Sequence, residues 1–294
     1  MEHHITCLNL SSSDIKKLKS AGYNYCTDLR ESVLNSQQID LPQVPLTKSA
    51  LLELEEELKN GFILSYNADL DQVLQDEISP KRITELTGLP GTGKSQISFQ
   101  LCVTVQLPKI HGGLEGEAVY INTNNNLASH RIRQLAERFL SQIASLGLNS
   151  DITSSIENIM KHIYVFKCYD FIDLLATVKY FEEFLKGKRI KLIVIDSISN
   201  PIRGVCQEER INILHSILSD LQLLSSKFNF AIVITNDYTV RIYNNETLYV
   251  PSFGDGLQHR VNSRIVLSKK GNIHYAELVK SIIKPYTKVA FNIL

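Results

Sequence analysis

The amino-acid sequence predicts an α/β fold in which helices cover a mostly parallel β-sheet. From about residue 62 onward, short apolar runs rich in β-branched residues alternate with longer stretches whose apolar residues recur every three or four positions. Near the C-terminus this alternation stops, and RIVLS and IHYAELVKS flank the turn sequence KKGN, which predicts an antiparallel hairpin at the sheet edge. The sequence therefore predicts a large α/β core that closes with antiparallel strands.

The individual elements follow from the period of their apolar residues. Strands are expected at ITELT (83–87), AVYI (118–121), HIYVF (162–166), KLIVID (191–196) and FAIVIT (230–235). Helices are expected at SQISFQLCVTVQ, FIDLLATVKYFEEFLKG and EERINILHSILSDLQLLSSKF, which lie between these strands.

The region before residue 62 divides into two smaller parts. Residues 1–40 contain a short helical unit around a glycine turn, too small to bury a core alone. Residues 41–61 combine two prolines with a leucine- and glutamate-rich helix that ends at Asn60, which predicts a linker and a docking helix. Residues 62–294 form the expected core.

Composition argues against several classes of protein. Thirty-one basic and thirty-one acidic residues cancel, so nucleic acid would have to be bound by a local patch rather than by net charge. The five cysteines form no C-x-x-C pair, which is typical of reduced thiols in an intracellular protein. The sequence has no charged leader before an apolar segment, and no apolar run reaches the roughly 18 residues of a membrane span. We therefore expect a soluble protein without a membrane partner.

The octet GLPGTGKS (88–95) carries the clearest chemical signal. It fits the pattern G-x-x-x-x-G-K-[ST] between a predicted strand and a predicted helix, which is the context that a phosphate-binding P-loop requires. Glycines let backbone N–H groups converge on phosphate oxygens, and the N-terminus of the helix favours negative charge. The pattern predicts a nucleoside triphosphate bound by Gly88, Leu89, Pro90, Gly91, Thr92, Gly93, Lys94 and Ser95.

Three residues have more specific expected roles. Lys94 would reach the β- and γ-phosphates, and Ser95 would coordinate Mg²⁺. Asp196, which ends the apolar strand KLIVID, would hold the metal ion through water. An acid at this position could also cap the following helix, and both interpretations stay open at this point.

Hydrolysis also needs a polar group that orients or deprotonates water near the γ-phosphate. The neighbouring strand end is expected to supply this group, and there the sequence reads INTNNNL (121–127). An amide hydrogen-bonds to water but does not accept a proton at neutral pH, so this stretch predicts nucleotide binding with poor turnover. Asparagines also cap helices, and the two roles are compatible.

Together these motifs resemble a known family. The series ITELTGLPGTGKSQISFQL, GGLEGEAVYINT, LIVIDSIS and AIVITND resembles the ATPase core of RecA- and RadA-type recombinases. Within that family the chain is most similar to the eukaryotic paralogues, in particular the C-type paralogue, through VQLP...GG..GEAVYI and LELEEELKNGFILSYNADLDQVL. The resemblance covers roughly residues 50–294 and implies a RecA-like P-loop core that binds ATP with Mg²⁺. IKKLKSAGYNYCTDL resembles only the first half of the family's helix-hairpin-helix lobe, which implies a truncated lobe.

Two positions depart from the family pattern. Where a family strand ends in I-D-T-E-G, this chain has Ile121 to Asn125, which places Asn124 at the position of the catalytic glutamate. Where the family has T-N-Q, with a glutamine that senses the γ-phosphate, this chain has Asp237 after Thr235 and Asn236. An acid beside a phosphate is repulsive unless a metal ion or a lysine screens it, and Asp237 could instead act as the base.

The resemblance also assigns residues outside the P-loop. Arg131 in SHRIRQLAERF matches the family's arginine that stacks on adenine, with surface pairing to Glu137 as the alternative. Two loops that line the family's channel for single-stranded DNA match residues 200–210 and 237–260, the second of which is long for a loop. Cationic and aromatic side chains suit a flexible strand, whereas ordinary solvated loops are the alternative. The expected DNA contacts are Arg203, Arg241, Tyr243 and Arg260.

The function that the resemblance implies is double-strand break repair by homologous recombination, whether meiotic or somatic. The chain would bind ATP within a complex of recombinase paralogues on single-stranded or branched DNA in the nucleus, and hydrolysis would be weak or absent because Asn124 replaces the glutamate. The alternative is an active ATPase dependent on single-stranded DNA, in which Asp237 or a partner's carboxylate serves as the base.

Overall fold

The computed structural model describes residues 5, 12–29, 47–124, 129–145, 156–243 and 246–293. Contacts divide the chain into two units, Met1–Glu55 and Glu56–Leu294, and each is described by itself. Asn125 and Asn126, which continue the asparagine run predicted to face the phosphates, lie outside the described residues.

The N-terminal unit is helical where it is described. It contains helix α1 (Ser12–Ser20) and the 3₁₀-helix η2 (Cys26–Asp28). Leu18 of α1 and Ile5 are fully buried and form a small apolar cluster. The helical lobe over residues 1–40 stays a prediction.

Helix α3 (Ala50–Asn60) spans the boundary between the two units. No residue of α3 is buried, and its leucines are between 51% and 74% exposed. Within the second unit the helix makes polar contacts: the Asn229 side chain donates to Asn60 at 2.9 Å, and Glu57 lies 3.9 Å from Arg82. The docking role of α3 stays a prediction.

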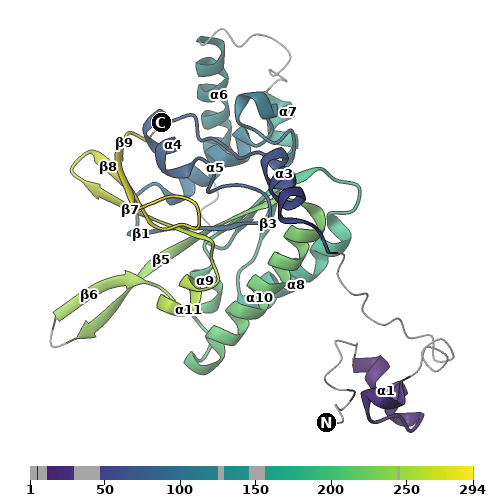
Figure 1. Cartoon of the computed structure of the whole chain (residues 1–294). Helices are drawn as coiled ribbons and strands as arrows, with labels where there is room; N and C mark the ends of the chain where they lie inside the picture. Colours follow the sequence, from purple (N-terminus) through teal and green to yellow (C-terminus); the bar gives the residue numbers. More distant parts are fainter. Residues whose placement is uncertain are drawn as a thin grey trace. The chain divides into compact units, whose positions relative to one another are not determined.

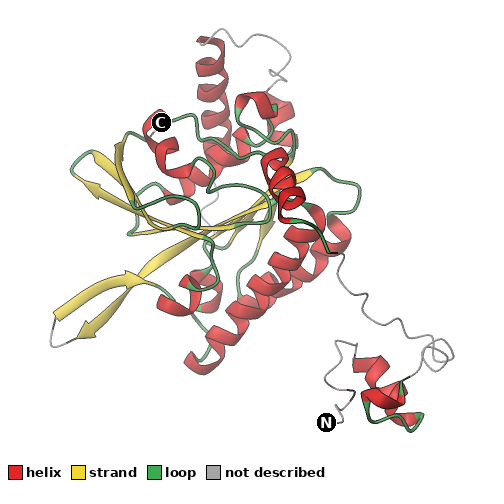
Figure 2. Cartoon of the chain, viewed as in Figure 1, coloured by secondary structure: helices red, strands yellow, loops and turns green. Residues whose placement is uncertain are grey.

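The second unit is built on a nine-stranded sheet (Figure 2). The strand order is β3-β2-β4-β5-β1-β7-β8-β9, and β6 pairs with β5. Neighbouring strands from β3 to β7 are parallel, whereas β8 is antiparallel to both β7 and β9. The strands are β1 (Ile83–Gly88), β2 (Glu117–Asn122), β3 (Ile163–Lys167), β4 (Ile190–Asp196), β5 (Ala231–Tyr243), β6 (Glu246–Pro251), β7 (Ser263–Lys270), β8 (Ile273–Lys280) and β9 (Thr287–Phe291). The predicted fold class is confirmed.

Helices cover both faces of this sheet (Figure 1), because successive residues of its central strands point to opposite faces and nearly all of them are apolar. On β4, Leu192 and Val194 belong to a core shared with α4 to α7, whereas Ile193 and Ile195 belong to a second core shared with α8 to α11. The helices are α4 (Ala68–Leu74), α5 (Lys94–Thr104), η3 (Lys109–His111), α6 (Ser129–Ser145), α7 (Ile156–Lys161), α8 (Phe171–Phe184), α9 (Ser199–Ile202), α10 (Gln207–Phe228) and α11 (Gly254–Gln258). Within the described ranges, none of the helices has the length and apolar character needed to cross a bilayer.

The expectation of a long loop over residues 237–260 is wrong. Strand β5 continues well past the core to Tyr243, and β6 pairs with it in antiparallel register before the short helix α11. The two strands form a ribbon that projects from the sheet (Figure 1). The residues DYTVRIY and ETLYV are rich in β-branched and aromatic side chains, which favour paired extended strands even where both faces meet solvent.

Candidate nucleotide site

The carboxyl ends of several strands lie next to one another along one side of the sheet, which we call the edge. Asn122 at the end of β2 pairs with Asp196 at the end of β4, and Gly88 at the end of β1 pairs with Asp237 on β5. In open α/β sheets, ligands bind outside the carboxyl ends of the strands. The candidates for phosphate, metal and water chemistry therefore share one place in the fold.

The loop at residues 88–95 turns sharply from β1 into α5. Gly91 has a φ of +80° and Gly93, the N-cap of α5, has a φ of +99°, a region that glycine adopts without strain. A Cβ atom on Gly93 would lie 2.4 Å from Cδ1 of Ile293. The backbone conformation therefore favours glycine at this position, and a larger residue would also displace the end of the Ile293 side chain.

The residues of this loop differ in exposure. Leu89, Pro90 and Ser95 are exposed, whereas Thr92 is buried and donates its hydroxyl to the carbonyl of Leu89 at 2.8 Å. This bond closes the turn. The outer side of the turn faces solvent. An exposed turn at the N-terminus of an 11-residue helix suits the binding of an anion such as phosphate.

Lys94 is almost fully buried and folds back across the loop. Its Nζ donates to the carbonyl oxygens of Gly88 at 2.8 Å and Leu89 at 3.2 Å, and lies 3.2 Å from Oδ1 of Asp237. An ammonium group has three N–H donors. Two of these donors bond to carbonyl oxygens of the loop, and the charge of the ammonium group is paired with the carboxylate of Asp237.

Asp237 reaches this cluster from β5. Its Oδ2 accepts hydrogen bonds from the hydroxyls of Ser197 at 3.1 Å and Ser199 at 3.2 Å, while Oδ1 faces Lys94. Its side chain is 25% exposed. The lysine that could screen an acid at this position is therefore present, and it contacts the carboxylate directly.

Asp196 is buried in a network of hydroxyl groups. Thr235 donates to its Oδ1 at 2.5 Å, and Tyr120 of β2 donates to its Oδ2. Burial, followed by the nearby charge of Asp196, raises the pKa of Tyr120 well above its usual range, so its hydroxyl remains a donor. The side chain of Ser95 lies near the same hydroxyl and opposes the rise in its pKa. Both predicted metal ligands are therefore neighbours of this phenol.

Sequence reasoning missed Tyr120. A signal was available, because a phenol on an otherwise apolar buried strand needs a hydrogen-bond partner. Its ring lies 4.6 Å, between centroids, from that of Phe99 on α5, which holds the hydroxyl toward the edge of the sheet.

The described end of β2 offers amides and a hydroxyl. Thr123 is fixed to the end of β4, because its hydroxyl donates to the Ser197 carbonyl at 2.9 Å and its carbonyl accepts from the Asn200 side chain at 2.6 Å. Asn124 is half-buried, and its N–H lies 3.4 Å from Oδ1 of Asn122. Up to Asn124, where the description of this strand end stops, β2 therefore presents no carboxylate to the site.

Arg131 lies in the first turn of α6. Its Nη1 donates to the side chain of Gln134 at 3.1 Å. Glu137, the alternative partner expected from the sequence, is instead contacted by Arg133 at 3.0 Å. The pairing of Arg131 with Glu137 is therefore not observed, and its side chain is only half-buried.

The structure brings two of the expected DNA-contact residues together. Arg203, which follows α9, and Arg241 on β5 line a pocket of about 350 Å³ that also includes Arg210 and Phe253. Two further lining residues also contact Asp237. The hydroxyl of Ser199 donates to its carboxylate, and the hydroxyl of Ser252 donates to its backbone carbonyl. This pocket, which we call the arginine pocket, therefore adjoins the back of the Lys94–Asp237 pair.

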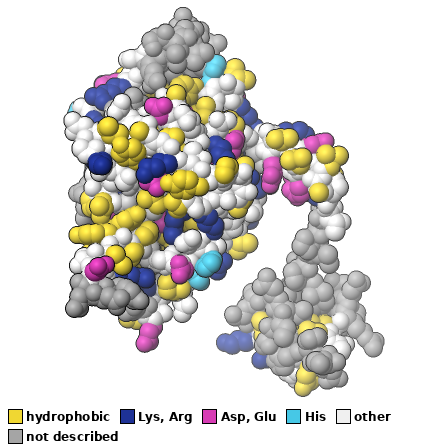
Figure 3. Space-filling view, turned by 60° about the vertical axis from the view of Figure 1, so that its left-hand side comes forward, with side chains coloured by type: hydrophobic (Ala, Val, Ile, Leu, Met, Phe, Trp, Pro, Cys, Tyr) yellow, Lys and Arg dark blue, Asp and Glu magenta, His cyan; other side chains and the backbone are white. Residues whose placement is uncertain are grey.

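The other two expected DNA-contact residues do not line the arginine pocket. Arg260 is exposed just after α11. Tyr243 pairs with Glu246 through the backbone at the far end of the ribbon, and its side chain lies outside the description. On the face displayed in Figure 3, Lys and Arg side chains are interspersed with apolar ones, in line with the balanced composition.

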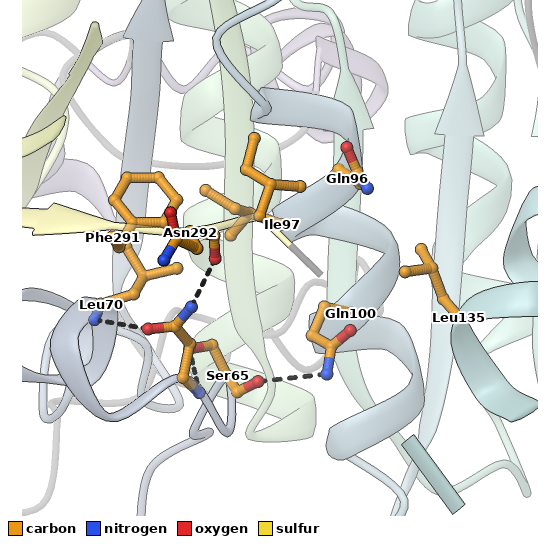
Figure 4. A pocket seen from close by; sticks show the side chains of 10 residues that line it. Ser65, Leu70, Gln96, Ile97, Gln100, Leu135, Phe291 and Asn292 are labelled. Atoms are coloured by element: carbon orange, nitrogen blue, oxygen red, sulfur yellow. Dashed lines mark hydrogen bonds between the residues drawn. The ribbon is translucent and has the colours of Figure 1, made fainter. Parts of the chain in front are cut away.

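A smaller pocket lies beside the loop on the side of α4 and β9 (Figure 4). Gln100 donates to the carbonyl of Ser65 at 3.1 Å, and Asn67 donates to the carbonyl of Asn292 at 2.7 Å. The volume, about 30 Å³, fits roughly one water molecule. The bond from Asn67 holds the C-terminal segment whose Ile293 approaches Gly93, so we assign this pocket to the support of the loop.

A buried ion pair lies inside the sheet, a few residues before the carboxyl ends of the strands. Arg264 of β7 donates to Glu85 of β1 at 2.6 Å, and Asn236 donates to the other carboxylate oxygen at 2.8 Å. Burial raises the pKa of Glu85, and the charge of Arg264 opposes that shift. Arg264 and Asn236 also donate to the carbonyls of Gly254 and Ser252, respectively. The pair therefore anchors the base of the ribbon.

The fold and the loop together define a class, the α/β domains of P-loop type. Comparison with known proteins gives the family: the Rad51 family model matches residues 62–294, and the chain belongs to the Rad51 family. Membership of this family implies ATP binding.

Individual relatives agree with this assignment. The DNA repair protein RAD51 homolog 3 of Cricetulus griseus is 31% identical over 276 residues, which cover 90% of this chain and 75% of that protein. Its namesake from Dictyostelium discoideum is 31% identical over 232 residues, which cover 76% of this chain and 61% of that protein. The DNA repair and recombination protein RadA of Aeropyrum pernix is 34% identical over 240 residues, which cover 79% of this chain and 70% of that protein. The chain thus spans between about three fifths and three quarters of these relatives.

Proposed function

We propose that this chain is an ATP-binding recombinase paralogue that acts in double-strand break repair by homologous recombination. It would work in the nucleus as one subunit of a complex with other paralogues, and it would hydrolyse ATP weakly or not at all. Support comes from membership of the Rad51 family and from the similarity to two proteins named RAD51 homolog 3.

The residues at the loop fit the phosphates of ATP. The turn with Gly91 and Gly93 in left-handed conformations presents the N-terminus of α5, and Lys94 stands within the same loop. Ser95 and Asp196 offer the oxygen ligands that Mg²⁺ prefers. The bound metal ion would neutralise part of the phosphate charge. This chain's own contribution is to hold the phosphates and to position their charge.

Weak turnover rests on one observation, the composition of the strand end beside the phosphates. Asn122 and Thr123 are buried, Asn124 takes the position at which we expect the catalytic base, and none of these side chains accepts a proton at neutral pH. The alternative base, Asp237, is held by Lys94 and two serine hydroxyls. Asp237 would have to release these contacts before it could accept a proton from water, so the geometry favours a binding role.

A DNA role is supported by the arginine pocket. Arg203 and Arg241 approach each other from two segments that are far apart in the sequence, beside the aromatic ring of Phe253. Cationic and aromatic groups together suit a single strand or a branch point, where bases are unstacked. Because Ser199 and Ser252 contact both Asp237 and this pocket, ATP bound at Lys94 would affect the shape of the DNA site.

The direct test is ATP turnover by the purified chain, alone and with single-stranded DNA, with Lys94→Ala as the blank and nucleotide binding measured separately. We expect binding of ATP with turnover no higher than the blank. DNA-stimulated turnover that survives Asn124→Ala and disappears in Asp237→Asn would instead support the active ATPase.

The subunit role has its own test. If ATP stabilises the contacts with other paralogues, co-purification of partner chains should be lost in Lys94→Ala and kept in Lys186→Ala, which removes an exposed lysine far along the chain. Assembly that is indifferent to nucleotide and to Lys94 would contradict this version of the proposal.

A further inference from the structure

The contacts of Lys94 raise a question about which nucleotide this site prefers. Two of its N–H donors bond to the carbonyl oxygens of Gly88 and Leu89, and its Nζ lies 3.2 Å from the carboxylate of Asp237, the one contact that involves a charge. A phosphate that binds Lys94 must therefore share it with a carboxylate or displace that carboxylate. Such competition depends on how much negative charge the incoming phosphate brings.

Asp237 is not free to swing away from the lysine without cost. Its Oδ2 is held by the hydroxyls of Ser197 and Ser199, and its backbone carbonyl accepts from both the N–H and the hydroxyl of Ser252, at 2.9 Å and 2.7 Å. The side chain of Asp237 is therefore held by the segment that follows β4, and its backbone is held by the base of the ribbon. The carboxylate stays beside the lysine when a ligand arrives.

The third phosphate of a nucleotide meets this carboxylate most directly. A P-loop lysine reaches the β- and γ-phosphates, and the end of the neighbouring strand faces the γ-phosphate. Like charges a few ångströms apart repel, and the partial burial of Lys94 and Asp237 strengthens this repulsion beyond its value in bulk water. A diphosphate lacks the group that would lie closest to Asp237, so the penalty falls mainly on the triphosphate.

We propose that Asp237 is a specificity-determining residue, a built-in counter-ion of Lys94 that weakens the binding of nucleoside triphosphate relative to diphosphate. This inference rests on the proposed function, because it takes the loop to be the phosphate site. It adds that the chain holds ADP at least as well as ATP.

The experiment compares two nucleotides on the full-length chain. The dissociation constants of ADP and of a non-hydrolysable ATP analogue are measured by calorimetry with Mg²⁺, on the wild type and on Asp237→Asn. Asparagine keeps the size of the side chain and an oxygen for the two serines, but removes the charge. The matched control is Asp255→Asn, which removes an exposed acid from the adjacent helix α11 and changes the net charge by the same amount.

In Asp237→Asn, the ATP analogue is expected to bind at least tenfold more tightly, while the affinity for ADP changes by less than about threefold. Asp255→Asn should leave both constants unchanged. An equal gain for both nucleotides, or weaker binding of the analogue, would overturn the inference.

The wild type alone gives a second test that does not depend on the folding of a variant. It should bind ADP at least as tightly as the ATP analogue, and a tenfold preference for the analogue would overturn the inference while leaving the proposed function standing. Absence of binding for both nucleotides, with the wild type no different from Lys94→Ala, would overturn the proposed function and the inference with it.

Discussion

Two ion pairs lie in the same part of the sheet, one inside it and one at the carboxyl ends of its strands, and they differ in burial, distance and the cation involved. Inside the sheet, Glu85 is fully buried and Arg264 is 7% exposed at 2.6 Å from it. At the edge, Asp237 is 25% exposed and Lys94 lies 3.2 Å away. Arginine binds a carboxylate through a rigid planar group, whereas lysine carries a compact charge on a flexible stem. The interior pair is closed off from solvent, whereas the edge pair lies where an incoming ligand can reach the lysine.

Removal of one partner should separate the two pairs most clearly. Arg264→Met leaves Glu85 as an uncompensated buried charge and is expected to cost about 3–5 kcal/mol in the free energy of unfolding. Lys94→Met leaves Asp237 with two hydroxyl donors and access to solvent, so its cost should be about 1–2 kcal/mol. Urea unfolding of both variants measures the difference. Equal costs would remove the distinction between the pairs.

Stabilisation by bound nucleotide should depend on the edge pair and not on the interior pair. At a hundredfold excess over its dissociation constant, ATP is expected to stabilise the wild type by about 2.7 kcal/mol, since a ligand that binds only the folded state stabilises it by RT ln(1 + [L]/Kd). Lys94→Ala should lose this gain, seen as a shift of Tm by thermal unfolding. The control Lys186→Ala, at an exposed lysine, should retain it. A full shift in Lys94→Ala would place the nucleotide elsewhere.

The third prediction concerns the carboxylate next to the edge pair. Tyr120→Phe removes the hydroxyl donor to Asp196 but keeps the ring packed on Phe99. A lost hydrogen bond to a charged buried group should lower the free energy of unfolding by about 1.5 kcal/mol. Tyr249→Phe, on the exposed ribbon, is the control and should be neutral. An unchanged stability of Tyr120→Phe would mean that water replaces the hydroxyl at no cost.

The smallest expected effect lies in the arginine pocket behind the edge pair. Arg241→Ala should weaken binding to single-stranded DNA and reduce the slope of log K against log salt by about 1, as expected for one lost phosphate contact. Fluorescence anisotropy over a salt series measures both quantities. Arg189→Ala, at the start of β4 on the opposite sheet edge, serves as the control. Identical slopes for the two variants would argue against a DNA contact at Arg241.

The parts that sequence could predict are those in which neighbouring residues act together. The loop 88–95 is one contiguous segment, and its spacing of glycine, lysine and serine predicts its turn and its helix. The strands and helices of the core follow from apolar period in the same way. Asp196 was expected at the edge because a charge at the end of an apolar run needs a reason to be there.

The parts that escaped prediction depend on which strands become neighbours. The contacts of Tyr120 with Asp196 and of Lys94 with Asp237 join elements that are remote in the chain, and no local pattern encodes them. The buried pair of Glu85 and Arg264 was invisible for the same reason. The sequence does not reveal the ribbon, because both of its faces are largely exposed and its strands lack the one-sided apolar alternation that marks a strand in a core.

Strand β5 carries three consecutive side chains that serve three different partners. Thr235 contacts Asp196, Asn236 contacts Glu85, and Asp237 contacts Lys94. A shift of this strand by one residue would misplace all of them at once, because successive side chains point in opposite directions. Insertions and deletions should therefore accumulate only beyond Asp237, and the ribbon is the stretch whose length can drift during evolution while the phosphate site keeps its alignment.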